Sequence, residues 1–91
     1  MELRWTSEAL SDLVRLHEFL APVNPEAASR AVQSLSAAPE RLLEHPRVGR
    51  KLAELSPREV RRLITGNYEV RYEIVADTIY VLRIWHTRES R

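Results

Sequence analysis

Cysteine is absent from this 91-residue chain, and so are long apolar runs. Without thiols the protein can form neither a disulfide framework nor a thiolate metal site, and its three scattered histidines lack the paired spacing of zinc sites. The first ten residues, MELRWTSEAL, have neither the basic start nor the apolar segment of a secretion signal. No run approaches the roughly eighteen apolar residues of a membrane span. We therefore expect a cytoplasmic protein with no metal, no other cofactor and no membrane partner.

The net charge is also low, at +1, but the charges are unevenly distributed along the chain. Residues 1–46 hold four cations and seven anions, whereas residues 63–91 hold four of each. Residues 47–62 hold six cations and only two glutamates, which gives this basic segment a net charge of +4. Its cations are Arg47, Arg50, Lys51, Arg58, Arg61 and Arg62. Such a segment is typical of a solvated surface, and it can also bind phosphate or an acidic partner.

A short strand and then an amphipathic helix are predicted at the start of the chain. The sequence ELRW favours a strand, and Thr6 or Ser7 can cap the following helix with a side-chain oxygen. Apolar residues then recur at helical spacing over residues 10–20, whereas Asp12 and Arg15 fall on the opposite side. One side of this helix is therefore expected to pack and the other to face water.

A second helix is predicted to begin at Asn24 and Pro25, which provide a cap and a suitable first residue. Pro39 removes one backbone hydrogen bond from this helix, but the apolar residues around it keep one helical phase. These residues are Ala28, Val32, Leu35 and Leu42. We expect a kinked helix that continues to about Glu44 and runs antiparallel to the first.

Three strands of an antiparallel meander are predicted after the basic segment. REVRRLIT, YEVRYEIV and TIYVLRIW are rich in β-branched and aromatic residues and are separated by turns. With regular alternation, the last strand is apolar on both sides, with Ile84 and His86 on one and Val81 and Trp85 on the other. The predicted fold class is α+β, with an N-terminal strand and a two-helix antiparallel hairpin packed on an antiparallel β-sheet, in one domain spanning residues 1–91.

The order and spacing of five segments resemble the RelE/ParE superfamily of bacterial toxins, and the ParE-like branch in particular. The segments are TSEALSDLVRLHEFL, NPEAASRAVQSL, LLEHPRVGRK, VRRLITGNYEVRYEI and IYVLRIWHTR. The resemblance covers nearly the whole chain. It implies the toxin half of a type II toxin-antitoxin pair, with a cognate antitoxin as the protein partner and operator DNA bound only through that antitoxin.

Two activities compete within the superfamily that the chain resembles. ParE-like members inhibit DNA gyrase by binding, whereas RelE-like members are ribosome-dependent mRNA endonucleases, which need cations together with an acid and a base. A third alternative is a toxin-derived module that has lost toxicity and only binds its partner. The low net charge favours gyrase as the target, because proteins that hold mRNA are typically more basic. We therefore expect a binding protein rather than an enzyme.

If the chain is a nuclease, its catalytic candidates are Arg62, Arg83 and His86. The arginines are candidates for a phosphate clamp, and His86 stands at a strand end with an unperturbed pKa near neutrality. Some nuclease members have a tyrosine after this histidine, where the chain has Thr87, and this difference argues against RNA cleavage. The structural alternatives are that His86 caps the sheet and that Arg83 pairs with a glutamate.

If the chain is a binding toxin, the resemblance implies target contacts at its C-terminal end, with His86, Arg88 and Arg91 as the candidates. An antitoxin is expected to contact the basic segment and the outward side of the last strand. The candidates for this contact are Arg47, Arg50, Lys51, Arg58, Val81 and Trp85. Within the basic segment, Gly49 suits a positive φ. The wide apolar stripes predict exposed apolar surface, which on a small chain usually marks an interface.

Overall fold

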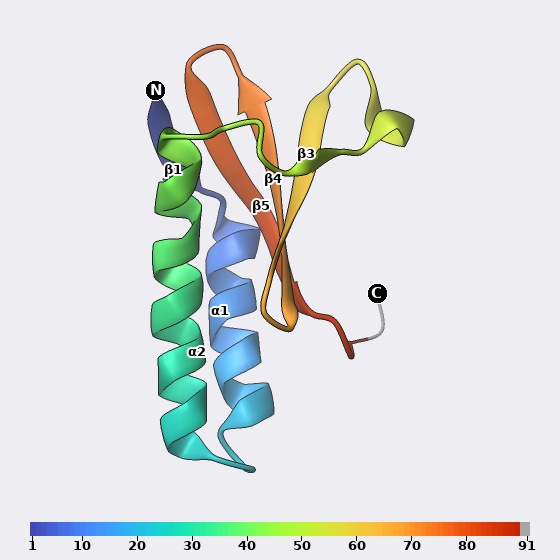
Figure 1. Cartoon of the computed structure of the whole chain (residues 1–91). Coiled ribbons are helices and arrows are strands. Elements are labelled where there is room, and N and C mark those ends of the chain that lie inside the picture. The colour runs from blue at the N-terminus through green and yellow to red at the C-terminus, as the bar shows by residue number, and fades with distance from the viewer. Residues whose placement is uncertain (90–91) are drawn as a thin grey trace.

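A five-stranded sheet and a helical hairpin form the two layers of the structure, a computed structural model that describes residues 1–89 (Figure 1). The strands are β1 (Glu2–Trp5), β2 (Arg50–Lys51), β3 (Glu59–Thr65), β4 (Tyr68–Val75) and β5 (Thr78–His86). The helices are α1 (Ser7–Leu20) and α2 (Pro25–Ala37), with 3₁₀ turns η1 (Ala38–Leu43) and η2 (Ala53–Leu55). The predicted α+β fold with an N-terminal strand and a helical hairpin is confirmed.

The sheet as a whole is mixed, and its strand order is β1-β5-β4-β3-β2. β3, β4 and β5 form the predicted antiparallel meander, and β2 pairs antiparallel with β3. β1 instead lies parallel to β5, with Trp5 opposite Val81 at the end of the paired segment. A parallel pair needs a long connection, which the hairpin and the other strands provide here. β5 is therefore an inner strand only over residues 78–81, and its later residues lie at an edge.

The two helices begin as predicted, because the side-chain oxygens of Thr6 and Asn24 accept hydrogen bonds from backbone N–H groups of the first turn. The predicted kink differs in form. α2 ends at Ala37, and the chain continues as the 3₁₀ turns of η1, since Pro39 cannot supply the α-helical hydrogen bond. Within the described part of the chain, no helix combines the length and apolar character needed to cross a membrane.

The core lies between the helical hairpin and one face of the sheet. Its buried members come from both helices and from the two central strands, together with Leu42 of η1. They include Leu16, Leu35, Val70, Tyr72, Ile79, Val81 and Ile84. Along β4, the alternate residues Val70, Tyr72 and Ile74 all pack in this core. The opposite, outer face of the sheet is left for charged side chains.

A β-bulge changes the side on which the later residues of β5 lie. The register passes from an Arg71–Arg83 pair to a Tyr72–Val81 pair, so that Leu82 is an extra residue in β5. An extra residue shifts the alternation of side chains by one position. The buried residues of β5 are Ile79, Val81, Ile84 and His86. The regular alternation predicted for this strand is therefore wrong.

Candidate functional site

The outer face of the sheet carries a polar cluster built around Glu69, whose residue is only 1% exposed. Its carboxylate lies 3.0 Å from Arg71 Nη2 and 3.7 Å from Arg62 Nη1. The Trp85 ring extends this outer cluster, with Arg71 Cζ at 4.7 Å and Arg83 Cζ at 5.1 Å from the ring centroid. The two arginines predicted as a phosphate clamp, Arg62 and Arg83, thus belong to one cluster. Within residues 1–89, no group of three or more histidine or acidic residues could hold a metal ion.

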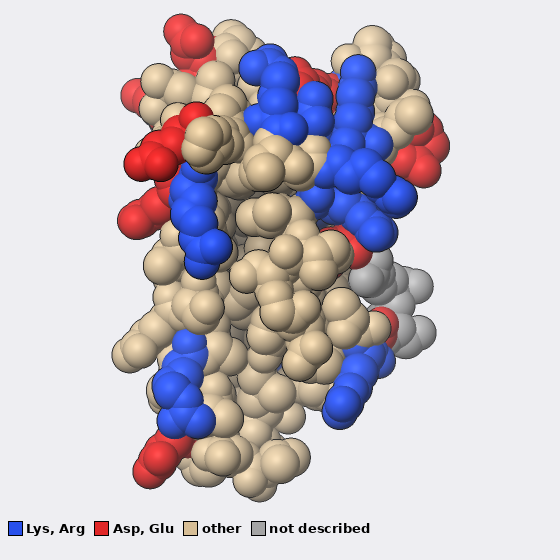
Figure 2. All heavy atoms as spheres, in the orientation of Figure 1, with Lys and Arg blue, Asp and Glu red and all other residues tan. Residues whose placement is uncertain are grey.

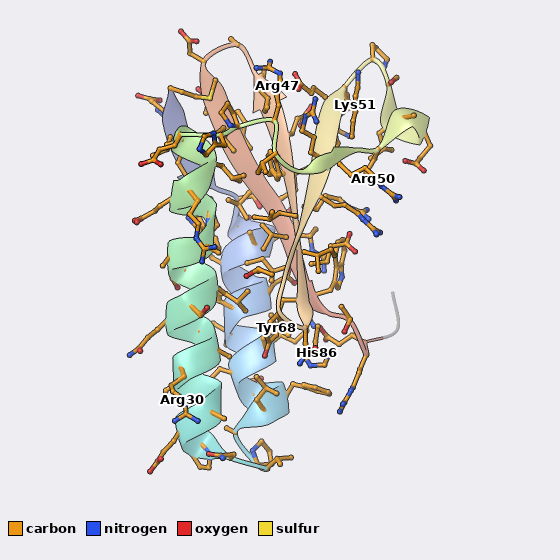
Figure 3. The ribbon with its side chains drawn as sticks, viewed as in Figure 1. Arg30, Arg47, Arg50, Lys51, Tyr68 and His86 are labelled. Atoms are coloured by element: carbon orange, nitrogen blue, oxygen red, sulfur yellow. The ribbon has the colours of Figure 1, made fainter. Side chains whose placement is uncertain are left out.

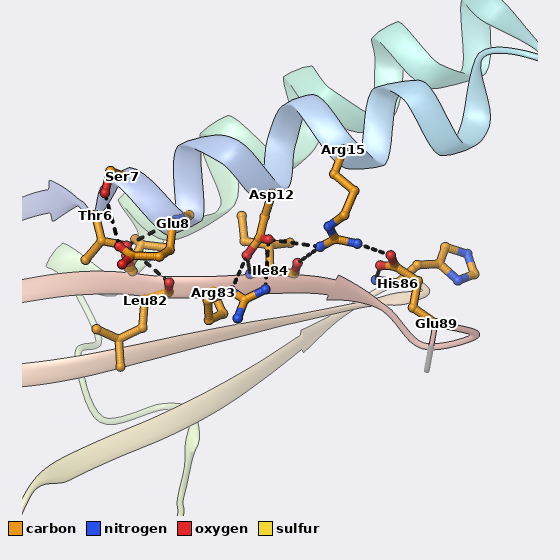
Figure 4. Close-up of polar contacts among 12 residues, drawn as sticks. Thr6, Ser7, Glu8, Asp12, Arg15, Leu82, Arg83, Ile84, His86 and Glu89 are labelled. Carbon is orange, nitrogen blue, oxygen red and sulfur yellow. Dashed lines mark hydrogen bonds and ion pairs between the residues drawn. The ribbon is translucent and has the colours of Figure 1, made fainter. Parts of the chain in front are cut away.

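A second polar cluster joins β5 to α1 through Asp12 (Figure 4). The buried carboxylate accepts hydrogen bonds from Arg83 Nε at 2.8 Å, the Ile84 N–H at 2.8 Å and Arg15 Nη2 at 3.0 Å. Burial would raise the pKa of Asp12, but these hydrogen bonds together hold it below its ordinary value. The predictions that Asp12 faces solvent and that Arg83 pairs with a glutamate are therefore wrong. Neither prediction took into account that α1 packs beside the edge of β5.

Side chains, rather than another strand, cover this edge of β5 as far as the C-terminal tail (Figure 4). Arg15 Nη2 donates to the carbonyl oxygen of Ile84 at 2.8 Å, and a Glu89 carboxylate oxygen accepts from the His86 N–H at 2.8 Å. Arg15 and Glu89 also form an ion pair with each other. These contacts satisfy backbone groups that an edge strand leaves open. The ion pair between Arg15 and Glu89 also holds the beginning of the C-terminal tail against α1.

His86 faces the helices, on the opposite side of the sheet from the outer cluster. Its ring centroid lies 5.1 Å from that of Tyr68, in edge-to-face geometry (Figure 3). The centroid of the Phe19 ring lies 5.8 Å away. Its Nδ1 accepts a hydrogen bond from the Arg88 N–H at 3.0 Å. Burial, and secondarily the charge of Arg88, lowers the pKa of His86 below its ordinary value and favours the neutral ring. The three nuclease candidates therefore do not share one site.

The basic segment contains both ion-paired and unpaired cations. Figure 2 shows lysine and arginine side chains gathered at the end of the molecule where this segment lies. Arg47 and Arg58 each form an ion pair at 2.8 Å, with a glutamate of β3 and of β4 respectively. Arg50 and Lys51 of β2 are exposed (Figure 3) and form no ion pair with any described residue. The unpaired charge of the segment thus lies on the short edge strand.

Gly49 is required for a close approach of two chain segments rather than for a positive φ. Its N–H donates to the Tyr72 hydroxyl at 3.0 Å, and this hydroxyl donates to the Pro46 carbonyl at 2.8 Å. A Cβ on residue 49 would lie 2.6 Å from the hydroxyl oxygen and 2.7 Å from the Arg62 carbonyl oxygen. The prediction that Gly49 has a positive φ is therefore wrong; of the two glycines, Gly66 has one, with φ at 58°. Gly49 therefore holds the basic segment against β4.

Only one of the two apolar residues predicted to contact an antitoxin is accessible. Val81 is fully buried, because the bulged strand turns it toward the helices and into the core beside Leu16 and Leu35. Trp85 lies on the outer face and is partly exposed. Val81 is thus corrected from a contact residue to a core residue. Of the predicted target contacts, Arg91 lies outside the described residues.

Exposed apolar residues on the groove side of the hairpin form a surface that the candidate residues did not include. Leu10 and Val14 of α1 are 52% and 60% exposed. A groove of about 290 Å³ lies between the two helices. Its lining consists of Leu13, Val14, His17, Glu18 and Val32. The wide apolar stripe of the first helix was the sequence signal for this surface, since a helix on one sheet buries only part of such a stripe.

Comparison with known proteins finds relatives over nearly the whole chain. The family model of the ParE toxin of the type II toxin-antitoxin system parDE matches residues 3–91. Toxin RelE2 of Caulobacter vibrioides is 33% identical over 82 residues, which cover 90% of each chain. Toxin RelE1 of the same organism is 32% identical over 83 residues, which cover 91% of this chain and 89% of the relative.

Two solved structures have the same arrangement of elements. One belongs to the chromosomal ParDE toxin-antitoxin system from P. aeruginosa, with a TM-score of 0.80 and 26% identity over 94% of this chain and 95% of that chain. The other belongs to the toxin-antitoxin complex RelBE2 from Mycobacterium tuberculosis, with a TM-score of 0.61 and 26% identity over 93% of this chain and 88% of that chain. The similarity therefore extends over both layers of the fold.

Proposed function

Because this chain belongs to the ParE toxin family and is a type II toxin of the ParE/RelE superfamily, we propose that it inhibits DNA gyrase by binding. The observation that carries this proposal is the position of His86. A nuclease needs an acid or base on the same phosphate that its cations hold. His86 instead packs against Phe19 and Tyr68 on the helix side of the sheet, and its Nδ1 is already hydrogen-bonded.

The proposed contact with gyrase is the C-terminal end of β5 and the tail that follows it. This contact comprises Arg88 and Arg91, as the family resemblance implies. His86, the third predicted contact, is only 6% exposed and packs toward the helices, so it supports the strand end and does not face a partner. The contacts of Arg15 and Glu89 support this assignment, because they hold the first residues of the tail in one position against α1. A fixed peptide end loses little conformational entropy when it binds a partner. The proposed action on gyrase takes place in the cytoplasm.

We expect the purified protein to block DNA supercoiling by gyrase and to leave mRNA on translating ribosomes intact. Arg88→Glu should weaken the inhibition at least tenfold, because it reverses a charge at the proposed contact, whereas Arg30→Glu on the distant helix should not. Supercoiling assays across a protein titration, with primer extension on ribosome-bound mRNA, measure both activities. Codon-positioned mRNA cuts that disappear in Arg62→Ala would instead establish the endonuclease.

We further propose that the cognate antitoxin covers the apolar surface of the hairpin. Leu10 and Val14 are exposed on the side of α1 that lines the groove between α1 and α2, and apolar surface of this kind usually marks an interface. The two solved relatives come from toxin-antitoxin systems, which supports an antitoxin as the occupant. Acidic residues of the antitoxin are proposed to face the basic segment. The proposed partners there are Arg47, Arg50, Lys51 and Arg58, with Trp85 at the outer face.

Val14→Asp should weaken binding of the antitoxin encoded beside this gene by about 100-fold, because it places a charge in a desolvated apolar contact. The side chain is 60% exposed, so the fold should be retained. Val75→Asp is a matched control, since Val75 is 48% exposed at the end of β4, outside both proposed antitoxin contacts. Isothermal calorimetry of both variants measures the difference. Equal affinities for the two variants would exclude the hairpin as the antitoxin site.

A further inference from the structure

One stripe of α1 follows β5 to the start of the C-terminal tail. Asp12, Arg15 and Phe19 are spaced by three and four residues, so they lie on the same side of the helix. Asp12 and Arg15 both hydrogen-bond the backbone of Ile84 (Figure 4). Phe19 packs against His86, the last residue of β5. Phe19 is thus the member of this stripe that lies beside the start of the tail.

The ring of Phe19 is only half covered, and its exposed side is separate from the groove of the hairpin. Phe19 is 50% exposed, because β5 ends at His86 and the sheet covers only part of the ring. Leu10, on the groove side, is 52% exposed. The two residues are separated by about two and a half helical turns, which places them on opposite sides of α1.

An exposed cation lies beside the same imidazole ring. The Arg88 N–H donates to His86 Nδ1 at 3.0 Å, which fixes the backbone of Arg88 next to the ring. Arg88 is exposed and forms no ion pair with any residue from 1 to 89. Glu89, its acidic neighbour in the sequence, is already paired with Arg15. His86 therefore contacts both a half-exposed aromatic ring and the backbone of an unpaired cation.

The support beneath these two exposed groups is rigid. His86 is 6% exposed, and the ring of Tyr68 packs edge-to-face against it at 5.1 Å. The His86 N–H donates to Glu89 at 2.8 Å, so the backbone at the strand end is held as well. Groups that are already fixed lose little conformational entropy when a partner covers them.

We propose that Phe19 is the apolar anchor of the surface by which the chain binds gyrase, with Arg88 as the charged group beside it. This inference rests on the proposed function and deepens it, because residues 87–91 supply cations but no large apolar side chain to that contact. Binding energy is usually concentrated in a few central residues, of which aromatic side chains and arginine are the commonest.

The partner surface that fits has an apolar pocket with carboxylates at its rim. The pocket would cover the exposed half of the Phe19 ring, and the carboxylates would pair with Arg88, which lacks an acidic partner in residues 1–89. An antitoxin is a poorer match for this surface, because the groove proposed for it is on the other side of α1.

The test uses the full chain with Phe19→Ala, in supercoiling assays and in direct binding to purified gyrase. Inhibition and binding should both weaken about 30-fold, the loss typical of truncating an interface anchor. Phe19→Leu, which keeps much of the apolar area, should lose less than about fivefold. The loss in Phe19→Ala should persist in high salt, whereas that in Arg88→Glu should shrink, because salt screens only the charged contact.

Leu10→Ala is the matched control, since it truncates an equally exposed apolar residue of the same helix. It should leave gyrase inhibition unchanged and weaken binding of the antitoxin encoded beside this gene, whereas Phe19→Ala should do the reverse. Hydrogen exchange of the His86 amide should stay slow in Phe19→Ala, because Glu89 still accepts its hydrogen bond. Phe19→Gln, which keeps two methylene groups against His86, serves if thermal unfolding shows that Phe19→Ala is not folded.

Three results would overturn the inference: gyrase binding by Phe19→Ala equal to that of wild type, weaker inhibition accompanied by fast exchange of the His86 amide, or loss of antitoxin binding in place of gyrase binding. The second would make Phe19 a support of the tail, and the third would assign its exposed side to the antitoxin. A wild-type chain that does not bind gyrase would instead contradict the proposed function itself, so the two failures are distinguishable.

Discussion

Replacing Asp12 with alanine should lower the free energy of unfolding by about 2–4 kcal/mol, which corresponds to a fall of about 10–20 °C in Tm. The buried carboxylate accepts hydrogen bonds from two guanidinium groups and from the Ile84 N–H. Its removal leaves that N–H buried without an acceptor. The cost is below that of a fully buried ion pair, because the side chains of Arg15 and Arg83 are 37% and 43% exposed and retain some hydration.

The control is Glu18→Ala, which removes an exposed carboxylate from the same helix and should change the stability by less than about 0.5 kcal/mol. Thermal and urea unfolding, followed by circular dichroism, measure both variants. A similar fall in Tm for the two variants would show that Asp12 has no special role in joining α1 to β5.

The stabilisation by Asp12 should also depend on pH in one direction. The pKa of Asp12 in the folded protein lies below its ordinary value of 3.8, because hydrogen bonds from Arg83, Ile84 and Arg15 outweigh the effect of burial. The unfolded chain therefore takes up this proton first as the pH falls. The stabilisation is complete above pH 3.8 and is lost as the pH falls through the folded-state pKa. The difference in Tm between wild type and Asp12→Ala should shrink in that range, and a constant difference would contradict the assignment.

Gly49→Ala should lower the free energy of unfolding by about 3 kcal/mol, because it combines overpacking with the loss of buried hydrogen bonds. The added Cβ would lie 2.6 Å from the Tyr72 hydroxyl oxygen and 2.7 Å from the Arg62 carbonyl oxygen. To relieve these contacts the basic segment must move away from β4. That movement breaks the bonds that join Gly49 and Pro46 to the Tyr72 hydroxyl.

Gly66→Asn provides the contrast, since a Cβ on Gly66 meets no atom within 4 Å. Its φ of 58° is one that asparagine adopts more readily than most residues, so the cost should stay below about 1 kcal/mol. Urea unfolding of the two variants separates close contact from backbone conformation. A larger loss of stability in Gly66→Asn than in Gly49→Ala would mean that these roles are assigned the wrong way round.

Local features of the chain were predictable because they depend on residues close together in sequence. The caps at Thr6 and Asn24, the helical spacing of α1 and the alternation of β4 all follow from backbone geometry over a few residues. The family resemblance also rests on such local segments and on their order. The form of the second helix after Ala37 was less predictable, since a proline permits either a kinked α-helix or 3₁₀ turns.

By itself, the sequence determined the helices, the strands, the basic segment and the toxin family. Only the tertiary structure decided which side chains meet. The extra residue Leu82 turned Val81 into the core, and the packing of α1 on the edge of β5 brought Asp12 to Arg83. The register of β2, β3 and β4 placed Arg62 between Arg50 and Arg71. The physical reason is that register and edge contacts join residues far apart in the chain, so a shift by one residue exchanges the faces of a strand without changing its local pattern.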